Sequence, residues 1–249
     1  MDVKLIQATQ NPIETMWVAA RTCYSKKSPI ELWEDAATTP TDKKWKLIKQ
    51  VLGSGHDSIA EHVSFTFAIE GVSRALTHQL VRHRHCTFSQ QSQRYVEIKE
   101  DMNELYKLLH SLSPASAVSS LITVCNKYFV GVTKDNVFSY AETLWEYLKR
   151  VHDGERPEDA RMILPNATKT NIVMTINLRE LIHVSNLRLC SRAQAEIQRL
   201  FREIKKAVAE YNMGISEMLI PSCEVNGFCK EHTCCGRKPH LSELLKKDI

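Results

Sequence analysis

The sequence has few residues that interrupt regular structure, with eight glycines and eight prolines among its 249 residues. Such a low content disfavours a turn-rich all-β architecture and favours helices. Long apolar runs are also absent: Leu121–Val130 is interrupted by Asn126 and Lys127 and is far shorter than the roughly 20 residues of a membrane span. Residues 1–10 contain no extended apolar region of the kind found in a secretory signal. We therefore expect a helix-rich cytoplasmic protein with no membrane partner.

No single charge sign dominates the chain. It carries 33 lysines and arginines against 29 aspartates and glutamates, a formal net charge of +4. The excess is small and evenly spread, so it does not indicate a nucleic-acid partner, although it is compatible with anionic small ligands. With 43% hydrophobic and 25% charged residues, the composition is that of an ordinary globular protein and excludes wholesale disorder.

The eight cysteines contain no paired C-x2-C spacing. Cys23, Cys86, Cys125 and Cys190 lie far apart in the sequence, which is typical of reduced thiols. The other four lie in the last 27 residues, near two histidines: Cys223, Cys229, Cys234, Cys235, His232 and His240. These residue types are zinc ligands, but their spacing is not that of the usual zinc motifs. We predict no metal site and interpret these cysteines as free thiols or an occasional disulfide, with a zinc site as the alternative.

Hydrophobic periodicity predicts a single helix-rich α+β domain. Alternating apolar residues predict strands over His62–Glu70, ended by Gly71, and over Asn171–Asn177. Helical spacing predicts seven helices, the last closed by Gly214: Asp42–Leu52, Val72–Arg82, Asp101–Leu109, Asn136–Val151, Arg156–Leu164, Leu178–Arg188 and Arg192–Tyr211. We place the domain at residues 1–220 and a Cys/His-rich tail at residues 221–249.

The segment Arg82–Tyr95 has the most unusual composition in the chain. It gathers three arginines, two histidines, several hydroxyls and three glutamines directly after an apolar helix. Guanidinium groups match phosphate and carboxylate oxygens, whereas hydroxyls and amides hydrogen-bond to the edges of bases and sugars. This composition predicts an anionic, nucleotide-like ligand; a solvated polar loop is the alternative.

Four sequence motifs, which follow one another along the chain, make the interpretation of this segment more specific. Arg82-His83-Arg84, seven residues and then Ser92 resembles the RHR(x7)S signature of the flavin-dependent thymidylate synthases. Before it, Gly55–His62 is similar to the family segment that meets the flavin from a neighbouring subunit. After it, Ala160–Pro165 resembles the AR-x-x-LP element, and residues 177–188 resemble the N-x-R and terminal arginine positions. Ala20-Arg21 extends the resemblance toward the N-terminus.

The resemblance implies a flavin-dependent thymidylate synthase-like fold, a helix-rich single α+β domain with a small, mostly antiparallel sheet. It also implies conversion of dUMP to dTMP, with 5,10-methylenetetrahydrofolate as the one-carbon donor and FAD, re-reduced by NADPH, as the hydride source. It implies a homotetramer whose active sites are shared between subunits, and no nucleic-acid partner. Arg188 would be catalytic, stabilising negative charge on the uracil ring. The residues implied to bind FAD are Ser58, Arg82, His83, Arg84, Gln90, Asn177, Arg179, His183 and His56. Those implied to bind the nucleotide are Gln79, Leu80, Val81, Arg82, Gln90, Gln91, Ser92, Gln93, Arg94, Arg161 and Arg188.

Some observations leave alternatives open. This chain has Thr87, Ser89 and Gln90 where some members carry Ser, Asn and Glu. Because Gln lacks the charge of Glu, the resemblance supports the role of Gln90 less strongly than that of Arg82. Cys86 and Cys190 adjoin arginines, yet the family needs no protein nucleophile, so we expect both to be structural. A zinc-containing RNA-binding module is the competing class, although only Phe88 and Tyr95 offer stacking surfaces near the basic segment. A nucleotide-binding relative without turnover is the third possibility.

Overall fold

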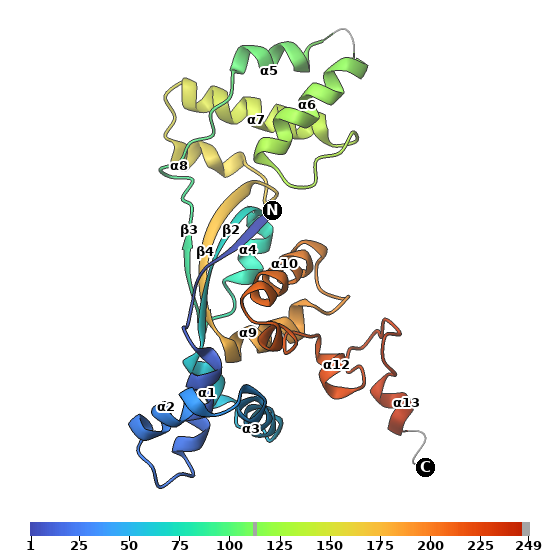
Figure 1. The fold of residues 1–249 in the computed structure, drawn as a ribbon. Helices are drawn as coiled ribbons and strands as arrows, with labels where there is room; N and C mark the ends of the chain where they lie inside the picture. The colour runs from blue at the N-terminus through green and yellow to red at the C-terminus, as the bar shows by residue number, and fades with distance from the viewer. Residues whose placement is uncertain (112–113, 246–249) are drawn as a thin grey trace. The chain divides into compact units, whose positions relative to one another are not determined.

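A computed structural model describes residues 1–111 and 114–245, and their course is drawn in Figure 1. The chain divides into two compact units, each built from segments that are separate in the sequence. Unit 1 comprises Met1, Ile69–Arg82 and Ser89–Ile172, and unit 2 comprises Asp2–Ala68, His83–Phe88 and the segment from Val173 onward.

Four strands form one antiparallel sheet in the order β1-β2-β4-β3. The strands are Asp2–Ala8 (β1), Ser64–Ser73 (β2), Cys86–Gln90 (β3) and Lys169–Asn177 (β4). Phe65, Phe67 and Ile69 of β2 are buried and alternate with partly exposed residues, as the sequence pattern predicts. The two predicted strands are the adjacent central pair, and the helix-rich α+β prediction is confirmed.

Unit 1 is built around a helical core. Its helices are Arg74–Leu80 (α4), Met102–Leu109 (α5), Pro114–Tyr128 (α6), Val137–His152 (α7) and Pro157–Ala160 (α8), followed by a 3-10 turn, Arg161–Ile163 (η2). Helices α5 and α6 both pack on α7, as Figure 1 shows. Leu105, Leu121, Phe129 and Leu144 are buried in their shared core. The helices predicted at 101–109 and 136–151 are confirmed, with Asp101 and Asn136 at the N-cap positions.

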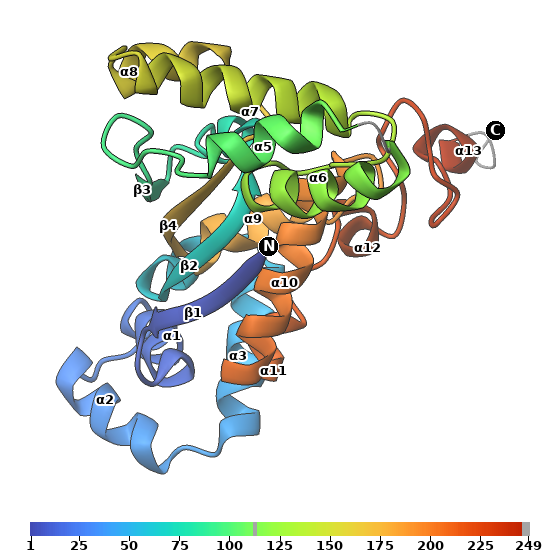
Figure 2. The ribbon, with the colours of Figure 1, turned by 90° about the horizontal axis from the view of Figure 1, so that it is seen from above.

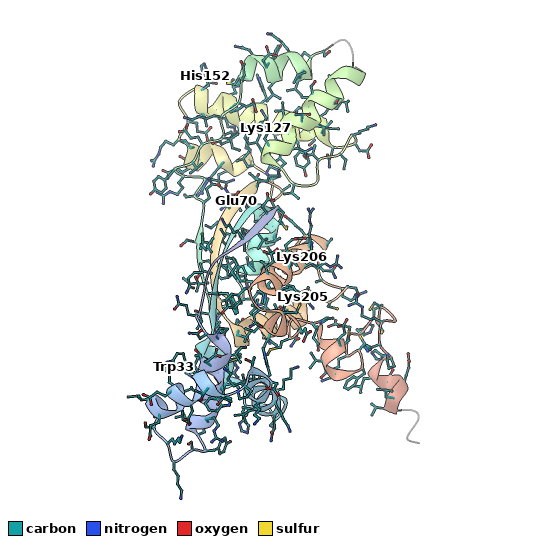
Figure 3. The ribbon with its side chains drawn as sticks, viewed as in Figure 1. Trp33, Glu70, Lys127, His152, Lys205 and Lys206 are labelled. Atoms are coloured by element: carbon teal, nitrogen blue, oxygen red, sulfur yellow. The ribbon has the colours of Figure 1, made fainter. Side chains whose placement is uncertain are left out.

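Unit 2 contains the remaining helices. They are Pro12–Thr22 (α1), Pro29–Thr38 (α2), Thr41–Gly53 (α3), the 3-10 helix Asp57–His62 (η1), Leu178–Arg188 (α9), Ala195–Tyr211 (α10), Met213–Ser216 (α11), Ser222–Asn226 (α12) and Leu241–Leu245 (α13). Helix α10 packs along β1 (Figure 2), and the Tyr211 hydroxyl donates to the carbonyl of Thr9. Trp33 on α2 is 46% exposed (Figure 3). Within the described residues, no helix is long and apolar enough to cross a membrane.

The prediction around Gly71 was wrong in its boundaries. Strand β2 does not end at Gly71 but continues to Ser73, because Gly71 adopts a φ of +66° within the strand and its amide donates to Asn171 Oδ1. Helix α4 therefore begins at Arg74, not at Val72, and its N-cap is Ser73, whose hydroxyl accepts from the Leu76 amide. It ends at Leu80, two residues before the predicted end.

Other element boundaries also differ from the predictions. The predicted helix Arg156–Leu164 is a single turn, α8, followed by η2. The predicted helix Arg192–Tyr211 begins only at Ala195, where the side chain of Gln194 caps it. Strand β3 was not predicted and lies inside the polar segment Arg82–Tyr95. The boundary near residue 221 stays a prediction.

Gly214 does not close α10 but lies within α11, where it allows a close approach to Trp45 of α3. A Cβ atom at Gly214 would lie 2.6 Å from Trp45 Cζ2. We expect Gly214→Ala to lower the free energy of unfolding by about 1–3 kcal/mol, measured by urea denaturation, because the indole ring must move. Gly53→Ala is the matched control, since no atom lies within 4 Å of its Cβ position. A Gly214→Ala protein as stable as Gly53→Ala would contradict this account.

Candidate active site

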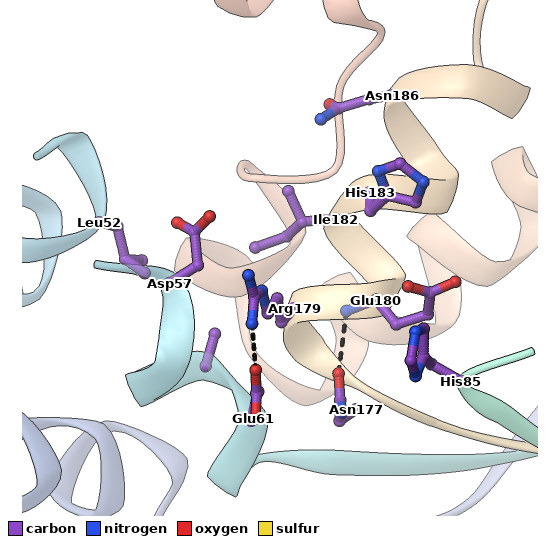
Figure 4. Close-up of a pocket in the computed structure, with 11 residues that line it drawn as sticks. Leu52, Asp57, Glu61, His85, Asn177, Arg179, Glu180, Ile182, His183 and Asn186 are labelled. Atoms are coloured by element: carbon purple, nitrogen blue, oxygen red, sulfur yellow. Dashed lines mark hydrogen bonds and ion pairs between the residues drawn. The ribbon is translucent and has the colours of Figure 1, made fainter. Parts of the chain in front are cut away.

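Unit 2 contains a pocket of about 610 Å³ beside helix α9 and the 3-10 helix η1 (Figure 4). Three residues predicted to bind the cofactor, Asn177, Arg179 and His183, lie in its lining. The complete lining is Leu52, Asp57, Ala60, Glu61, His85, Asn177, Arg179, Glu180, Ile182, His183 and Asn186. The volume is in the range of pockets that bind small ligands.

The start of α9 sets the positions of these side chains. Asn177 occupies the N-cap, and its Oδ1 accepts a hydrogen bond of 2.9 Å from the Glu180 amide. Because the helix begins there, Arg179, His183 and Asn186 follow at spacings of four and three residues, which places them on one face. The predicted helix Leu178–Arg188 is confirmed with both of its boundaries.

Arg179 is held in the pocket by an ion pair with Glu61 of η1, drawn as a dashed line in Figure 4. The hydrogen bond to Glu61 is the main cause that raises the pKa of Arg179, and the charges of Glu61, Asp57 and Glu180 add to it. We did not single out Glu61 from the sequence. The available signal was its place inside the block Gly55–His62.

Arg188, the predicted catalytic residue, is hydrogen-bonded to His83. Its Nε donates to His83 Nε2 over 3.2 Å, which requires a lone pair on that nitrogen and so a neutral imidazole with its proton on Nδ1. On the other side of the ring, Nδ1 lies 3.8 Å from Glu180 Oε1. His83 is only 8% exposed. Burial, followed by the nearby Arg188 and His183, lowers the pKa of His83 to about 4.

This lowered pKa predicts a pH dependence of stability. The folded-state value of about 4 lies below the ordinary 6.5, so the unfolded chain takes up the proton first as the pH falls. Stability contributed by neutral His83 is complete above pH 6.5 and is lost between pH 6.5 and pH 4, by at most about 3 kcal/mol.

We expect His83→Gln to weaken this acid dependence, because an amide accepts from Arg188 without titrating. Urea denaturation at pH 7 and pH 5 measures the difference, with His152→Gln at the exposed end of α7 (Figure 3) as the control. Equal pH dependence in wild type and His83→Gln would contradict the assignment.

Unit 1 carries a second group of cationic side chains. Nη1 of Arg74, at the start of α4, is buried and has no hydrogen-bond partner among the described residues, and the same is true of Nε2 of Gln93. Burial lowers the pKa of Arg74, and the charge of Arg161 lowers it further. Arg161 itself donates through Nε to the Glu158 carbonyl, 3.1 Å away. The two neighbouring guanidinium groups, one of them with an unpaired buried nitrogen, would be satisfied by an anion.

Two other predicted residues of unit 1 are engaged within the protein. Arg94 Nε lies 2.9 Å from Glu158 Oε2. Gln90 donates through Nε2 to the hydroxyls of Thr77, at 3.1 Å, and Thr170, at 3.3 Å. Gln90 therefore joins β3 to α4 and β4, a role for which a neutral amide is suited.

Several predicted residues lie elsewhere within their own units. Ser58 lines a different hollow of unit 2, of about 490 Å³, together with Trp33 and His62. The Leu80 side chain is fully buried, so only its backbone is available to a ligand. The remaining predicted residues are exposed or partly exposed: His56, Gln79, Val81, Arg82, Arg84, Gln91 and Ser92.

The thiol of Cys86 is not suited to be a nucleophile. Burial, together with the charge of Glu180, raises its pKa to about 12. A thiol with that pKa stays protonated at neutral pH and is unreactive. Across residues 1–111 and 114–245, no three His, Cys, Asp or Glu side chains are placed so that they could hold a metal ion.

The chain is similar to known proteins over most of its length. Residues 4–211 match the family described as thymidylate synthase complementing protein. The flavin-dependent thymidylate synthase of Clostridium tetani is 36% identical, over 97% of this chain and 96% of that protein. The flavin-dependent thymidylate synthase of Pyrococcus horikoshii is 39% identical, over 92% of this chain and 89% of that protein.

The fold is also that of a solved structure. The flavin-dependent thymidylate synthase ThyX from Helicobacter pylori, crystallised with FAD and dUMP, superposes with a TM-score of 0.67 at 23% identity. The match covers 88% of this chain and 100% of that one. Together with the extended similarity to the curated relatives, these matches show that the chain belongs to the flavin-dependent thymidylate synthase family.

Proposed function

We propose that this protein catalyses the reductive methylation of dUMP to dTMP. The methylene group comes from 5,10-methylenetetrahydrofolate, and the hydride comes from FAD, which NADPH reduces. The observation that carries the proposal on this chain is the buried, unpartnered Nη1 of Arg74, which lies near the cation of Arg161. Gln93 Nε2 is another buried donor of unit 1 with no partner among the described residues. Such donors call for an acceptor-rich anion, and the phosphate and uracil of dUMP supply both kinds of acceptor.

In this proposal the nucleotide phosphate is bound by Arg161 and Arg74, the second of which we did not identify from the sequence. A guanidinium matches phosphate oxygens in a bidentate arrangement and stays charged at any working pH. The other nucleotide-binding residues remain those that the resemblance implies.

The pocket beside α9 fits a flavin cofactor. Asn186, which lines it, has a buried Oδ1 with no hydrogen-bond partner among the described residues, and this acceptor suits a ring N–H group. Arg179, Asn177 and His183 would hold the cofactor from the same helix. When bound, FAD supplies the hydride.

Arg188 is proposed to activate the uracil ring. Its guanidinium can accommodate negative charge that develops on the pyrimidine oxygens when C5 acts as a nucleophile. The neutral His83 accepts a hydrogen bond from Arg188 and thereby restricts the orientation of the guanidinium without competing for its charge. No thiol is required, which agrees with the raised pKa of Cys86.

We also propose that the enzyme works as a homotetramer in the cytoplasm. Ser58 lines a hollow other than the pocket that contains Arg179, which supports a role for Ser58 at the site of a neighbouring subunit. Free thiols at all eight cysteines are typical of a reducing compartment.

The visible absorption spectrum of the purified protein tests the proposal. We expect flavin bands that bleach with NADPH under anaerobic conditions, faster when dUMP is present, and dTMP on addition of the folate. Bleaching of the flavin bands without formation of dTMP would favour a nucleotide-binding relative without turnover. A protein that stays colourless after incubation with FAD would overturn the flavin assignment and favour the zinc-containing RNA-binding alternative.

A further inference from the structure

The C-terminal cysteines gather in a second, small pocket of unit 2. Its volume is about 80 Å³, and four thiol side chains line it: Cys190 just after α9, Cys223 in α12, Cys229 and Cys235. All four are free thiols in this structure. Residues up to 45 positions apart thus contribute sulfur atoms to one place, which is unusual for thiols that only fill space.

One of these thiols has the surroundings of a nucleophile. Cys235 is exposed, and its sulfur is hydrogen-bonded by the Ser191 hydroxyl and by the Arg237 amide. These two hydrogen bonds and the charge of Arg237 lower the pKa of Cys235. Cys223 differs, because burial raises the pKa of its thiol. The cluster therefore pairs an accessible thiol of lowered pKa with a neighbouring thiol of raised pKa.

The charged residues of the lining are mainly cationic. Arg192, Lys230 and Arg237 contribute positive charge, and Glu231 contributes the one carboxylate of the lining. Arg237 is also paired with Glu224 at 3.2 Å. A pocket of this kind favours an anionic reagent over a neutral one.

We propose that this cluster is a thiol-modification site for anionic low-molecular-weight disulfides of the glutathione class, with Cys235 as the attacking residue and Cys223 as the resolving residue. The thiol pocket shares one lining residue, Asn186, with the pocket beside α9, but none of its cysteines lines that pocket. The inference does not depend on the proposed enzymatic activity.

The reaction consists of two successive thiol–disulfide exchanges. The Cys235 thiolate attacks one sulfur of the small disulfide, whose S–S bond breaks, and the departing thiolate takes the proton that Cys235 lost. Cys223 then gives up its proton and attacks Cys235 Sγ, which releases the second small thiol. Two protein thiols are oxidised to one disulfide, and one small disulfide is reduced to two thiols.

Disulfide exchange on the reduced, full-length protein tests the proposal. The probe is glutathione disulfide, and peptide mass mapping follows each cysteine with time. Cys23, an exposed thiol at the end of α1, is the internal control. We expect Cys235 to react roughly tenfold faster than Cys23. Cys235→Ser should remove the fast phase, and Cys23→Ser should leave it unchanged.

The resolving step has its own signature. In the wild type the glutathione adduct should give way to a Cys223–Cys235 disulfide, whereas in Cys223→Ser the adduct should persist. Limiting iodoacetamide on the wild-type protein ranks the same thiols without any substitution. Equal labelling of Cys23 and Cys235, an adduct that persists in the wild type, or stoichiometric bound Zn²⁺ that protects the cluster would each overturn the proposal.

Discussion

Replacing Arg188 by alanine is expected to lower the kcat of dTMP formation by about 10²–10³-fold, because the charge that develops on the uracil ring loses its fixed cation. The variant should still bind FAD, since the proposed cofactor contacts of Arg179, Asn177 and His183 are unchanged. Anaerobic single-turnover assays of dTMP, together with the flavin absorbance of the purified variant, measure both quantities.

The control for this experiment is Arg202→Ala. Arg202 is an exposed arginine on α10 that hydrogen-bonds to Gln198, and its removal takes away one positive charge from the same unit. Turnover should stay near the wild-type value. If Arg188→Ala kept full activity, the electrostatic role assigned to Arg188 would be wrong, whatever the fate of the flavin.

Replacing Arg74 by methionine is expected to weaken dUMP binding by roughly 30- to 100-fold, the effect of losing a charge-assisted hydrogen bond to phosphate. The same change should not lower the Tm of the free protein. Arg74 is a partly buried cation with an unpaired Nη1 near Arg161, so the folded protein gains little from its charge while no ligand is bound. Calorimetric titration with dUMP and thermal unfolding measure the two effects.

Weaker dUMP binding together with an unchanged Tm distinguishes a ligand-binding arginine from a structural one. Arg150→Met is the matched control, because Arg150 is paired with Glu146 on the outside of α7. It should leave dUMP affinity unchanged. A fall in Tm with unchanged dUMP affinity in Arg74→Met would show that Arg74 serves the fold instead.

The elements that were predictable from the sequence are those whose signals are local. Helix α9 has a capping asparagine just before its first residue, and β2 alternates phenylalanines with polar residues, so each pattern is complete within its own segment. Strand β3 lacks such a pattern. Only Phe88 is a large apolar residue in it, and its Gln90 side chain bonds to a threonine 80 positions away. Edge strand β1 was not predicted either, because its residues are only partly buried and give no clear apolar pattern.

The same distinction applies to the candidate site. The resemblance identified Arg179, His183 and Arg188 by their spacing on one helix. Glu61 and Arg74 became visible only in three dimensions: Glu61 pairs with an arginine 118 positions later, and Arg74 is notable for a nitrogen that lacks a partner. Neither the ion pair of Glu61 nor the unpartnered nitrogen of Arg74 can be recognised from a local sequence pattern.

The interleaved chain order of the two units has a consequence for synthesis. Unit 1 is complete once Ile172 has been made, whereas in unit 2 strand β1 packs against helix α10, and Thr9 is bonded to Tyr211, 202 positions later. Because a chain is translated from its N-terminus, β1 leaves the ribosome long before α10 exists. Helices α1, α2 and α3 can pack on one another as they emerge, but the surface of β1 that α10 covers stays open until residues 195–211 have been made.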